Sequence, residues 1–592
     1  MSEPLERARA WIRDDPDPDD RAELAALVAR AEARDAAASR ELLDRFSGPL
    51  EFGTAGLRGV VAAGESRFNR AVILRATAGL CAHVLSLPNA GERGIVIGHD
   101  ARRSSQAMAI AAAEVAAARG LRVHLLLGPS PTPLVAFGVK ALGAAAGVAV
   151  TASHNPPEYN GYKVYLDRGS QIVPPHDAEI AAQIAQAPAA KDVPRLALEE
   201  ARARGRVTDA RGIEALYIEA VLGLRRLEVA ADRLRIAYTP LHGVGERLTR
   251  EVFARAEYRR FHSVPEQSEP DGSFPTVRFP NPEEPGALDR VVALAEQVDA
   301  DLILAQDPDA DRLAAGARNA QGRFQILTGN ELGVLLAHHV LTREGPPEPR
   351  ELVVTTVVSS AQLGHIARAL GVRYAECLTG FKWIAHTAME IEAREGVEFA
   401  FGFEEALGYT IGSVVRDKDG IGAALVMAEL AADAKAHGET IFDRLRTIRE
   451  RYGLFVSRQR SIVLPGREGA ARIRSVMQRL HGSPLRQVGG LAVDRSWDLE
   501  RRRRDHRDGT SEPMEHLPPA DVVILELEDG SRAAVRPSGT EPKVKLYLEV
   551  RESLAAHEPL EDAERRAATR LDGLERALLD ATGLKDASLS VG

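Results

Sequence analysis

Short apolar runs alternate along most of the chain with helical runs. GIVIG (94–98) precedes an alanine-rich helical run, and GVAV (147–150) precedes a polar loop. The alternation returns at RIAYTP (235–240), DLILAQ (301–306), ELVVTTVVSS (351–360) and EFAFGF (398–403). Strands that alternate with helices predict layered α/β domains with largely parallel sheets.

The two ends of the chain follow other patterns. Leu24, Leu27, Val28 and Ala31 recur at helical spacing, which predicts a helical extension over residues 1–46. Residues 522–550 place an Asp-Gly turn between two apolar runs and add a third such run, which predicts antiparallel strands followed by a helix. Stretches near 186–212, 344–350 and 458–468 are interpreted as linkers, and the basic run 500–509 as a solvated loop.

Composition narrows the class of protein. The chain has 592 residues and a net charge of −9, which argues against nucleic acid or an anionic membrane as partner. Its two cysteines form no CxxC pair, so neither a disulfide framework nor a zinc site is indicated. No signal peptide and no apolar run of spanning length is visible. We therefore expect a cytoplasmic protein.

Two loops carry candidate chemistry. In TASHNPP (151–157), Ser153 stands at the end of a buried-strand pattern, either as a turn residue or as a group held out for reaction. In DPDADR (307–312), Asp307, Asp309 and Asp311 alternate, and on an extended loop their side chains would point to one side. Three converging carboxylates favour a hard divalent cation, Mg²⁺ or Mn²⁺.

Two other uses of the aspartate loop can be weighed. An EF-hand starting at Asp307 would need Gly and Glu where the chain has Arg312 and Arg318, so that possibility fails. A phosphatase that uses Asp307 as its nucleophile remains open, since this aspartate follows an apolar run closely.

Further loops offer anion and hydroxyl binding. RPSGTEPK (536–543) combines an arginine, hydroxyls, a glycine and a lysine, which suits a phosphate without being a Walker A loop. GFEEALGY (402–409) offers two glutamates, although a Glu pair that opens a helix also complements its dipole. FGTAGLRG (52–59), TGFKWI (379–384) and RDKDG (416–420) contribute Arg58, Lys382 and Lys418.

These loops together resemble the α-D-phosphohexomutase superfamily of phosphoglucomutases and phosphomannomutases. TASHNP resembles its phosphoserine loop, DPDADR its metal loop, GFEEALGY its sugar loop and RPSGTEPK its phosphate loop, in the family's order over about residues 50–550. The N-terminal extension, FGTAGLRG and GFEE resemble the branch with phosphopentomutase, glucose-1,6-bisphosphate synthase and related bacterial phosphoglucomutases. Ala406 stands where many members have Ser, so a sugar preference is not transferred.

The resemblance implies an α/β protein with three similar mixed α/β domains and a smaller α+β C-terminal domain, heart-shaped around a central cleft. The expected division is an N-terminal helical extension (1–46), domain 1 with the phosphoserine loop (47–205), domain 2 with the metal loop (206–324), domain 3 with the sugar loop (325–457) and domain 4 with the phosphate loop (458–592).

The resemblance also implies a mutase that interconverts sugar 1-phosphate and 6-phosphate through a phosphoserine and a bisphosphorylated sugar. Glucose is the first expectation, with mannose or pentose as alternatives and an aspartate-nucleophile phosphatase as the rival class. Mg²⁺ is the expected cofactor and glucose 1,6-bisphosphate or another sugar bisphosphate the activator. The expected partner is a phosphosugar, with no nucleic acid or membrane, and the protein is expected to be a monomer or small homo-oligomer.

The site residues implied by the resemblance fall into four groups. Lys163 is the candidate general acid/base, a role that requires a lowered pKa. His154 is expected to contact phosphate or substrate, because adjacent residues of an extended loop point apart. The residues expected to act in catalysis are Ser153, Lys163, His154, Arg58 and Arg312. The expected metal ligands are Ser153, Asp307, Asp309 and Asp311. The residues expected to bind the substrate are Thr379, Gly380, Lys382, Glu404, Glu405 and Lys418, and those expected to bind its phosphate are Arg536, Ser538, Gly539, Thr540 and Lys543.

Overall fold

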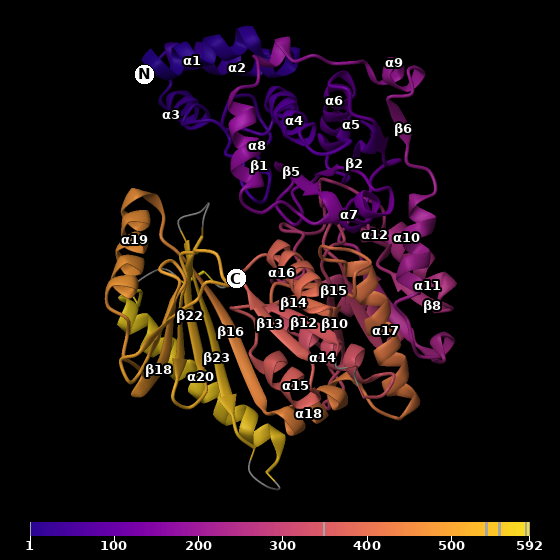
Figure 1. The fold of residues 1–592 in the computed structure, drawn as a ribbon, viewed down its shortest axis with the longest axis vertical. Coiled ribbons are helices and arrows are strands. Elements are labelled where there is room, and N and C mark those ends of the chain that lie inside the picture. The colour runs from indigo at the N-terminus through magenta and orange to yellow at the C-terminus, as the bar shows by residue number, and fades with distance from the viewer. Residues whose placement is uncertain are drawn as a thin grey trace. The chain divides into compact units, whose positions relative to one another are not determined.

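A computed structural model describes residues 2–346, 348, 350–538, 543–554, 558–585 and 589–590. Figure 1 shows the labelled helices and strands of the chain. The chain forms two compact units. Unit 1 comprises residues 1–318, 323–326 and 408–433, and unit 2 comprises residues 319–322, 327–407 and 434–592. No helix in the described ranges is long and apolar enough to cross a membrane.

Three helices begin unit 1, as the sequence predicts: α1 (Ser2–Asp14), α2 (Pro18–Glu32) and α3 (Ala36–Arg45). The side chains of Asp17 and Asp35 cap α2 and α3 by accepting bonds from first-turn N–H groups. The periodic apolar residues of α2 pack with Leu42 and Phe46 in a small core. Arg45 fastens this core to the next segment by donating from Nη1 to the carbonyl of Ala63 (3.0 Å).

The first sheet of unit 1 has the order β1-β5-β4-β2-β3-β6. Strands β4, β2, β3 and β6 are parallel, whereas β5 runs antiparallel to both β4 and β1. The strands are β1 (Leu57–Val60), β2 (Ile95–His99), β3 (Val123–Leu125), β4 (Ala146–Val150), β5 (Tyr159–Leu166) and β6 (Val207–Asp209).

Helices flank this sheet, and one of them lies in a segment that is predicted from the sequence to be a linker. The helices are α4 (Arg70–Val84), α5 (Ala90–Arg93), α6 (Ser105–Ala118), α7 (Thr132–Ala141), α8 (His176–Ala185) and α9 (Leu198–Ala203), with 3₁₀ turns η1 (Asp167–Gly169) and η2 (Ala190–Asp192). Residues 186–212 are not a linker, because they hold α9 and the edge strand β6. Their proline and charge content reflects an exposed edge of the sheet.

The second sheet of unit 1 has the order β11-β10-β9-β7-β8. Its strands are β7 (Arg235–Thr239), β8 (Arg260–Ser263), β9 (Leu302–Ala305), β10 (Ala314–Arg318) and β11 (Phe324–Ile326). Helices α10 (Ile213–Leu222), α11 (Glu246–Arg255), α12 (Pro265–Ser268) and α13 (Asp289–Val298) and the turn η3 (Ala231–Arg233) accompany it. β15 (Gly408–Ile411) and residues 420–433 of α17 (Gly420–Ala436) complete unit 1.

Unit 2 contains a parallel set of strands. β12 (Glu351–Thr356) pairs in parallel with β13 (Arg373–Cys377) and β14 (Glu398–Glu404). Helices α14 (Gly329–Thr342), α15 (Gln362–Leu370), α16 (Phe381–Glu395) and α18 (Ile441–Tyr452) belong to this part. The predicted linker at 344–350 falls partly on Pro347 and Pro349, which lie outside the described residues.

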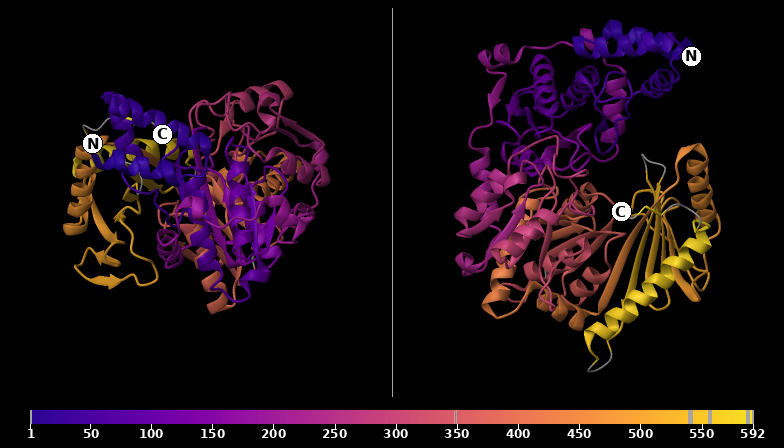
Figure 2. Two further views of the ribbon diagram at one scale, coloured as in Figure 1. Left: turned by 90° about the horizontal axis from the view of Figure 1, so that it is seen from above. Right: turned by 180° about the vertical axis from the view of Figure 1, so that it is seen from behind.

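The rest of unit 2 is a largely antiparallel sheet of order β20-β19-β18-β21-β22-β23-β16-β24, in which β17 pairs with β18. Helix α20 lies along this sheet (Figure 2). The elements are β16 (Leu454–Val463), α19 (Gly466–Gly482), β17 (Gln487–Val488), β18 (Leu491–Asp498), β19 (Arg503–His506), β20 (Ser511–Pro513), β21 (Val523–Leu527), β22 (Arg532–Pro537), β23 (Lys543–Glu552), α20 (Leu560–Thr582) and β24 (Leu589–Ser590).

Sequence predictions for this region succeed in part. The antiparallel strands over 522–550 are confirmed, with Asp529 and Gly530 between β21 and β22. Residues 458–463 are not a linker, because they belong to the ten-residue strand β16. Residues 503–506 of the basic run are a strand, not a solvated loop, because Arg503 and Arg504 pair through their backbones with β18 and β20.

Candidate active site

Ser153 lies three residues beyond the buried strand β4. Its N–H donates to Thr151 Oγ1 (2.9 Å), and its φ of +53° is left-handed, an uncommon conformation for a residue other than glycine. The residue is only 3% exposed. The loop is therefore turned at the serine, and the expectation of an extended loop is wrong.

Arg102 holds the backbone behind this serine. It is buried, and its Nη2 donates to the carbonyls of Ser153 (2.7 Å) and Asn155 (2.6 Å). Its Nη1 donates to the carbonyls of Pro156 (2.6 Å) and Tyr159 (2.9 Å). One planar guanidinium thus fixes four carbonyls of a single loop.

Asp100, at the end of β2, completes this support. It accepts bonds from Arg102 Nε (3.1 Å) and Thr151 Oγ1 (2.7 Å). The sequence analysis overlooked both Asp100 and Arg102. The sequence feature that could have indicated these two residues is the polar run HDARRSS. It directly follows the apolar run 94–98, at the same edge of the sheet as the serine loop.

The three aspartates follow β9 in a turn. Ala310 has a φ of +56°, and its N–H donates to the Asp307 carbonyl (2.9 Å). One carboxylate oxygen from each of Asp307, Asp309 and Asp311 lies within 4.8 Å of the others, and all three residues are buried. The carboxylates converge, but through a turn and not through the extended alternation expected from the sequence.

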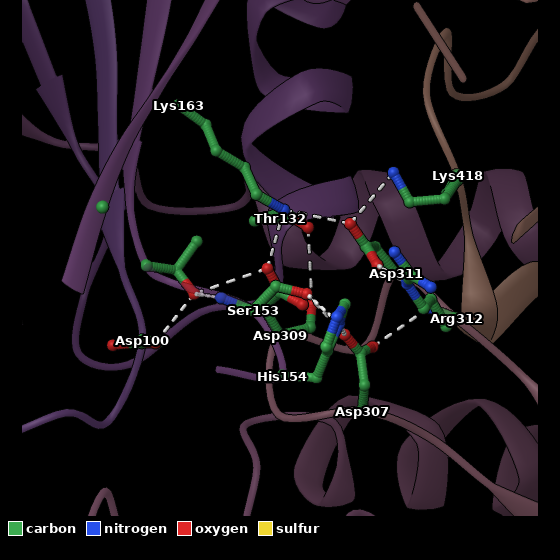
Figure 3. Close-up of polar contacts among 12 residues, drawn as sticks. Asp100, Thr132, Ser153, His154, Lys163, Asp307, Asp309, Asp311, Arg312 and Lys418 are labelled. Atoms are coloured by element: carbon green, nitrogen blue, oxygen red, sulfur yellow. Dashed lines mark hydrogen bonds and ion pairs between the residues drawn. The ribbon is translucent and has the colours of Figure 1, made fainter. Parts of the chain in front are cut away.

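The serine and aspartate loops meet within unit 1 (Figure 3). Ser153 Oγ donates to Asp307 Oδ2 (2.8 Å) and lies 3.1 Å from His154 Nδ1. The expectation that His154 points away from Ser153 is wrong, because the left-handed turn brings the two side chains together. Burial, with the nearby Arg312 and Arg58 cations, holds the pKa of His154 well below its usual value, so its imidazole is neutral at pH 7.

Two lysines neutralise the aspartates. Lys163 Nζ, from β5, lies 2.8 Å from Asp309 Oδ2 and 3.0 Å from Asp311 Oδ2. Lys418 Nζ lies 3.2 Å from Asp311 Oδ2. Burial alone would lower the pKa of Lys163, but Asp309 and Asp311 raise it above its usual value. The expected lowering of this pKa is therefore wrong while the lysine pairs with the carboxylates.

The cluster fits a hard divalent cation. Asp309 Oδ1 and Asp311 Oδ1 are buried and have no hydrogen-bond partner. Burial, and next the charge of Asp311, raises the pKa of Asp309 to about 7. Two buried carboxylate oxygens without a hydrogen-bond donor, and a carboxyl group whose pKa is raised by burial and by a neighbouring carboxylate, indicate a site for more positive charge than the two lysines supply.

Two arginines expected at the site lie beside these loops. Arg58, on β1, donates from Nη1 to Asn155 Oδ1 (3.3 Å), so it contacts the serine loop. The Arg312 N–H donates to Asp307 Oδ1 (3.1 Å), and Arg312 Nη1 lies 3.8 Å from Glu283.

The expected substrate residues other than Lys418 lie in unit 2. Thr379 and Gly380 follow β13, Lys382 begins α16, and Glu404 and Glu405 follow at the end of β14. Since β12, β13 and β14 are parallel, these groups share the carboxyl edge of the strands. Ser359 Oγ donates to Glu405 Oε2 (3.0 Å), whereas Thr379 Oγ1 is buried without a hydrogen-bond partner.

The expected phosphate residues join β22 to β23 in unit 2. Arg536 lies on β22, and the Ser538 N–H donates to the Lys543 carbonyl (2.8 Å). Gly539 and Thr540 lie outside the described residues. A hollow of about 410 Å³ beside this loop is lined in part by Arg536, Pro537, Ser538 and Asp521.

Comparison with known proteins identifies the family. The chain matches the models "Phosphoglucomutase/phosphomannomutase, alpha/beta/alpha domain" I, II and III over residues 49–191, 215–320 and 328–452, and the C-terminal domain of that family over residues 493–567. It is 37% identical to a probable phosphomannomutase of Haemophilus influenzae over 88% of this chain and 99% of that protein.

Two further matches agree with this result. The chain is 35% identical to a phosphoribomutase of Saccharomyces cerevisiae over 91% of each chain. Its fold is similar to the crystal structure of a putative phosphomannomutase from Thermus thermophilus, with a TM-score of 0.64, 24% identity, and coverage of 89% of this chain and 99% of that one. The chain, with three α/β/α domains and a C-terminal domain, belongs to the phosphoglucomutase/phosphomannomutase family, and it is an isomerase of that type.

Proposed function

We propose that this enzyme interconverts the 1-phosphate and 6-phosphate of a hexose, with glucose as its first substrate, through a phosphorylated Ser153. The observation that carries the proposal is the 2.8 Å contact between Ser153 Oγ and Asp307 inside a cluster of three buried carboxylates. A hydroxyl, a cation site and flanking basic groups are what phosphoryl transfer requires.

Asp307, Asp309, Asp311 and an oxygen of the phosphoserine would hold Mg²⁺. The ion would supply charge neutralisation to the phosphoryl group in transfer. The chain's own cations act in the same direction: Arg312 and Arg58 lie at the serine and aspartate loops, where they attract the phosphoryl oxygens.

The proposed transfer moves one phosphoryl group from Ser153 to the sugar. The bond between phosphorus and Ser153 Oγ breaks, and a bond forms between phosphorus and a free hydroxyl of the sugar monophosphate. The net movement of the proton is from that hydroxyl to Ser153 Oγ. The sugar bisphosphate then turns over and returns its other phosphoryl group to the serine by the reverse step. We therefore expect glucose 1,6-bisphosphate to activate the enzyme.

We propose Lys163 as the general acid/base, with His154 as the second candidate. While Lys163 pairs with the carboxylates it holds a proton, so it can donate one to Ser153 Oγ as the bond to phosphorus breaks. His154 is neutral and in contact with Ser153 Oγ, so it can accept the proton of the sugar hydroxyl.

Substrate recognition is proposed for two further groups of residues. Thr379, Gly380, Lys382, Glu404, Glu405 and Lys418 would contact the sugar, and Arg536, Ser538, Gly539, Thr540 and Lys543 the phosphate that is not reacting. The unpartnered Thr379 hydroxyl supports a role in binding.

Several expectations remain predictions. They are the preference for glucose over mannose or pentose, the monomeric or small homo-oligomeric state, the cytoplasmic location, and the domain boundaries after residues 46, 205, 324 and 457.

The test is a coupled assay with Mg²⁺ and a trace of glucose 1,6-bisphosphate. It compares glucose 1-phosphate, mannose 1-phosphate and ribose 1-phosphate for the wild type and Ser153→Ala. We expect isomerisation by the wild type and a loss of at least about 10⁴-fold in the variant, as for other enzymes that lose their nucleophile. The order of rates names the sugar.

The rival class predicts a different result. A phosphatase with Asp307 as nucleophile would release inorganic phosphate and would keep this activity in Ser153→Ala. That outcome would overturn the proposal.

A further inference from the structure

A second group of potential metal ligands lies in the C-terminal part of unit 2. His481 stands near the end of α19 and is buried. Three carboxylates from other segments surround its ring: Asp498 at the end of β18, Glu500 two residues later, and Asp521 just before β21. The family comparison assigns no role to these residues.

The two ring nitrogens of His481 have different surroundings. Nδ1 donates to Asp498 Oδ1 (2.8 Å), and Asp498 is buried. A buried carboxylate on one nitrogen fixes the orientation of the ring and makes the other nitrogen a better metal ligand. The Arg501 N–H also donates to Asp498 Oδ1 (3.0 Å), and this second contact helps to fix the carboxylate against the imidazole.

The other nitrogen faces two carboxylates. His481 Nε2 lies 2.9 Å from Asp521 Oδ1 and 3.0 Å from Glu500 Oε2, and one ligand atom from each of the three residues lies within 4.8 Å of the others. The side chains of Asp521 and Glu500 are 49% and 60% exposed, so water can complete a coordination shell.

The local charge favours a cation. Asp498, Glu500 and Asp521 contribute three negative charges, and Arg501, whose Nε lies 3.6 Å from Asp498 Oδ2, contributes one positive charge. One arginine and one imidazole do not exceed this negative charge even if the imidazole is protonated.

We propose that His481 Nε2, Glu500 and Asp521 bind a divalent transition-metal ion of the Zn²⁺ type, with Asp498 orienting the imidazole. A nitrogen with two carboxylate oxygens is a donor set that suits Zn²⁺, whereas Mg²⁺ prefers oxygen ligands alone.

The site would join elements that are distant in sequence. A metal bound there would link the end of α19 to the segment at Asp521. Asp521 also lines the hollow of about 410 Å³ that Arg536 and Ser538 border. Occupancy of the metal site would therefore steady one wall of the hollow beside the proposed phosphate loop.

The experiment measures Zn²⁺ binding to the full-length, metal-stripped enzyme by equilibrium dialysis. Millimolar Mg²⁺ is present to occupy the aspartate cluster of unit 1. Because His83, His176 and Glu179 form another cluster of potential ligands among the described residues, the informative quantity is the difference between variants. The variants are His481→Gln and Glu500→Gln, and His262→Gln on the exposed face of β8 is the matched control.

We expect the wild type and His262→Gln to bind one equivalent of Zn²⁺ more than His481→Gln. Glu500→Gln, a change at an exposed position, should weaken that equivalent without unfolding the protein. Asp498→Asn should lower the affinity by about 10- to 100-fold, as changes in the groups that orient metal ligands do.

Thermal unfolding supplies a second readout. Added Zn²⁺ should raise the melting temperature of the wild type more than that of Glu500→Gln, because a ligand that binds the native state stabilises it. Equal Zn²⁺ stoichiometry and an equal shift in melting temperature for wild type, His481→Gln and Glu500→Gln would overturn the proposal. His481 would then be an imidazolium paired with carboxylates.

Discussion

The aspartate cluster of unit 1 and the histidine cluster of unit 2 both bring several carboxylates together, but they differ in burial and in the groups that offset the negative charge. The cluster of Asp307, Asp309 and Asp311 is buried and offers oxygen ligands only, and Lys163 and Lys418 compensate its charge. The cluster of His481, Glu500 and Asp521 is partly exposed, offers a nitrogen as well, and depends on Asp498 for its orientation.

This difference follows from burial. A carboxylate removed from water needs a partner of opposite charge, so the buried cluster must hold either protein cations or a metal ion. At the exposed cluster, water screens the carboxylates, and the positioning of one imidazole decides the ligand geometry. Burial and fixed charge suit the transfer of a phosphoryl group, whereas the exposed cluster suits a structural link.

Of the substitutions that test this comparison, the largest effect should come from the buried cluster. We expect Asp309→Asn to lower mutase turnover by about 10³-fold, because a metal ligand and several kcal/mol of charge stabilisation are lost. Asp299→Asn, at a largely exposed position just before β9, is the matched control. Steady-state rates across a Mg²⁺ titration measure both; a turnover of Asp309→Asn near that of the control would contradict the assignment.

A substitution of Lys163 tests whether this lysine, which offsets the charge of Asp309 and Asp311, also takes part in catalysis. Lys163→Met should lower turnover by about 10²- to 10³-fold, as for the loss of a general acid/base, while Ser153 is still phosphorylated. Lys191→Met, at an exposed ion pair with Asp14, is the control. Intact-mass analysis measures the phosphoserine, and unchanged turnover would remove Lys163 from the mechanism and leave His154 as the proton carrier.

Arg102 tests how the serine loop is held. Arg102→Lys cannot reproduce the four carbonyl contacts, so we expect turnover to fall about tenfold, within the 10²-fold that a 1 Å displacement can cost. The free energy of unfolding should fall by about 2 kcal/mol. Urea denaturation and turnover are measured together; a loss of stability with full turnover would make Arg102 a merely structural residue.

The smallest effect concerns pH and contrasts two histidines of unit 2. Burial and nearby carboxylates act in opposite directions on His481, and the net effect raises its pKa, whereas burial and nearby cations lower the pKa of His338 to about 4. Because the unfolded chain protonates a histidine near pH 6.5 and the folded chain only near 4, His338 destabilises the fold as pH falls from about 6.5 to 4. His338→Gln should show a smaller drop in melting temperature over this range; an identical drop would show that other groups dominate.

Much of the fold could be predicted from local patterns. The apolar runs at 94–98, 147–150, 235–240 and 301–306 all contain strands, and the helical spacing around Leu24 corresponds to α2. The failures at 186–212 and 458–468 have one cause. Edge strands and long antiparallel strands tolerate charge and proline on their exposed side, so composition there imitates a linker.

The candidate active site could be predicted only in part from the sequence. The positions of Ser153 and of the three aspartates could be predicted, because each group follows the carboxyl end of a strand that is recognisable as an apolar run. The contact between His154 and Ser153 could not, because it depends on a left-handed φ at Ser153. Nor could Asp100 and Arg102, since a polar run after a strand does not reveal which distant carbonyls it will hold.

The sequence by itself determined the order of the loops, the alternation of strands and helices, and the set of chemical groups available for phosphoryl transfer. Only the tertiary structure decided that Lys163 and Lys418 neutralise Asp311, and that Asp498 and Asp521 meet at His481. The reason is physical. Periodicity reports which face of a local element is buried, whereas charge compensation depends on side chains that folding brings together from separate segments.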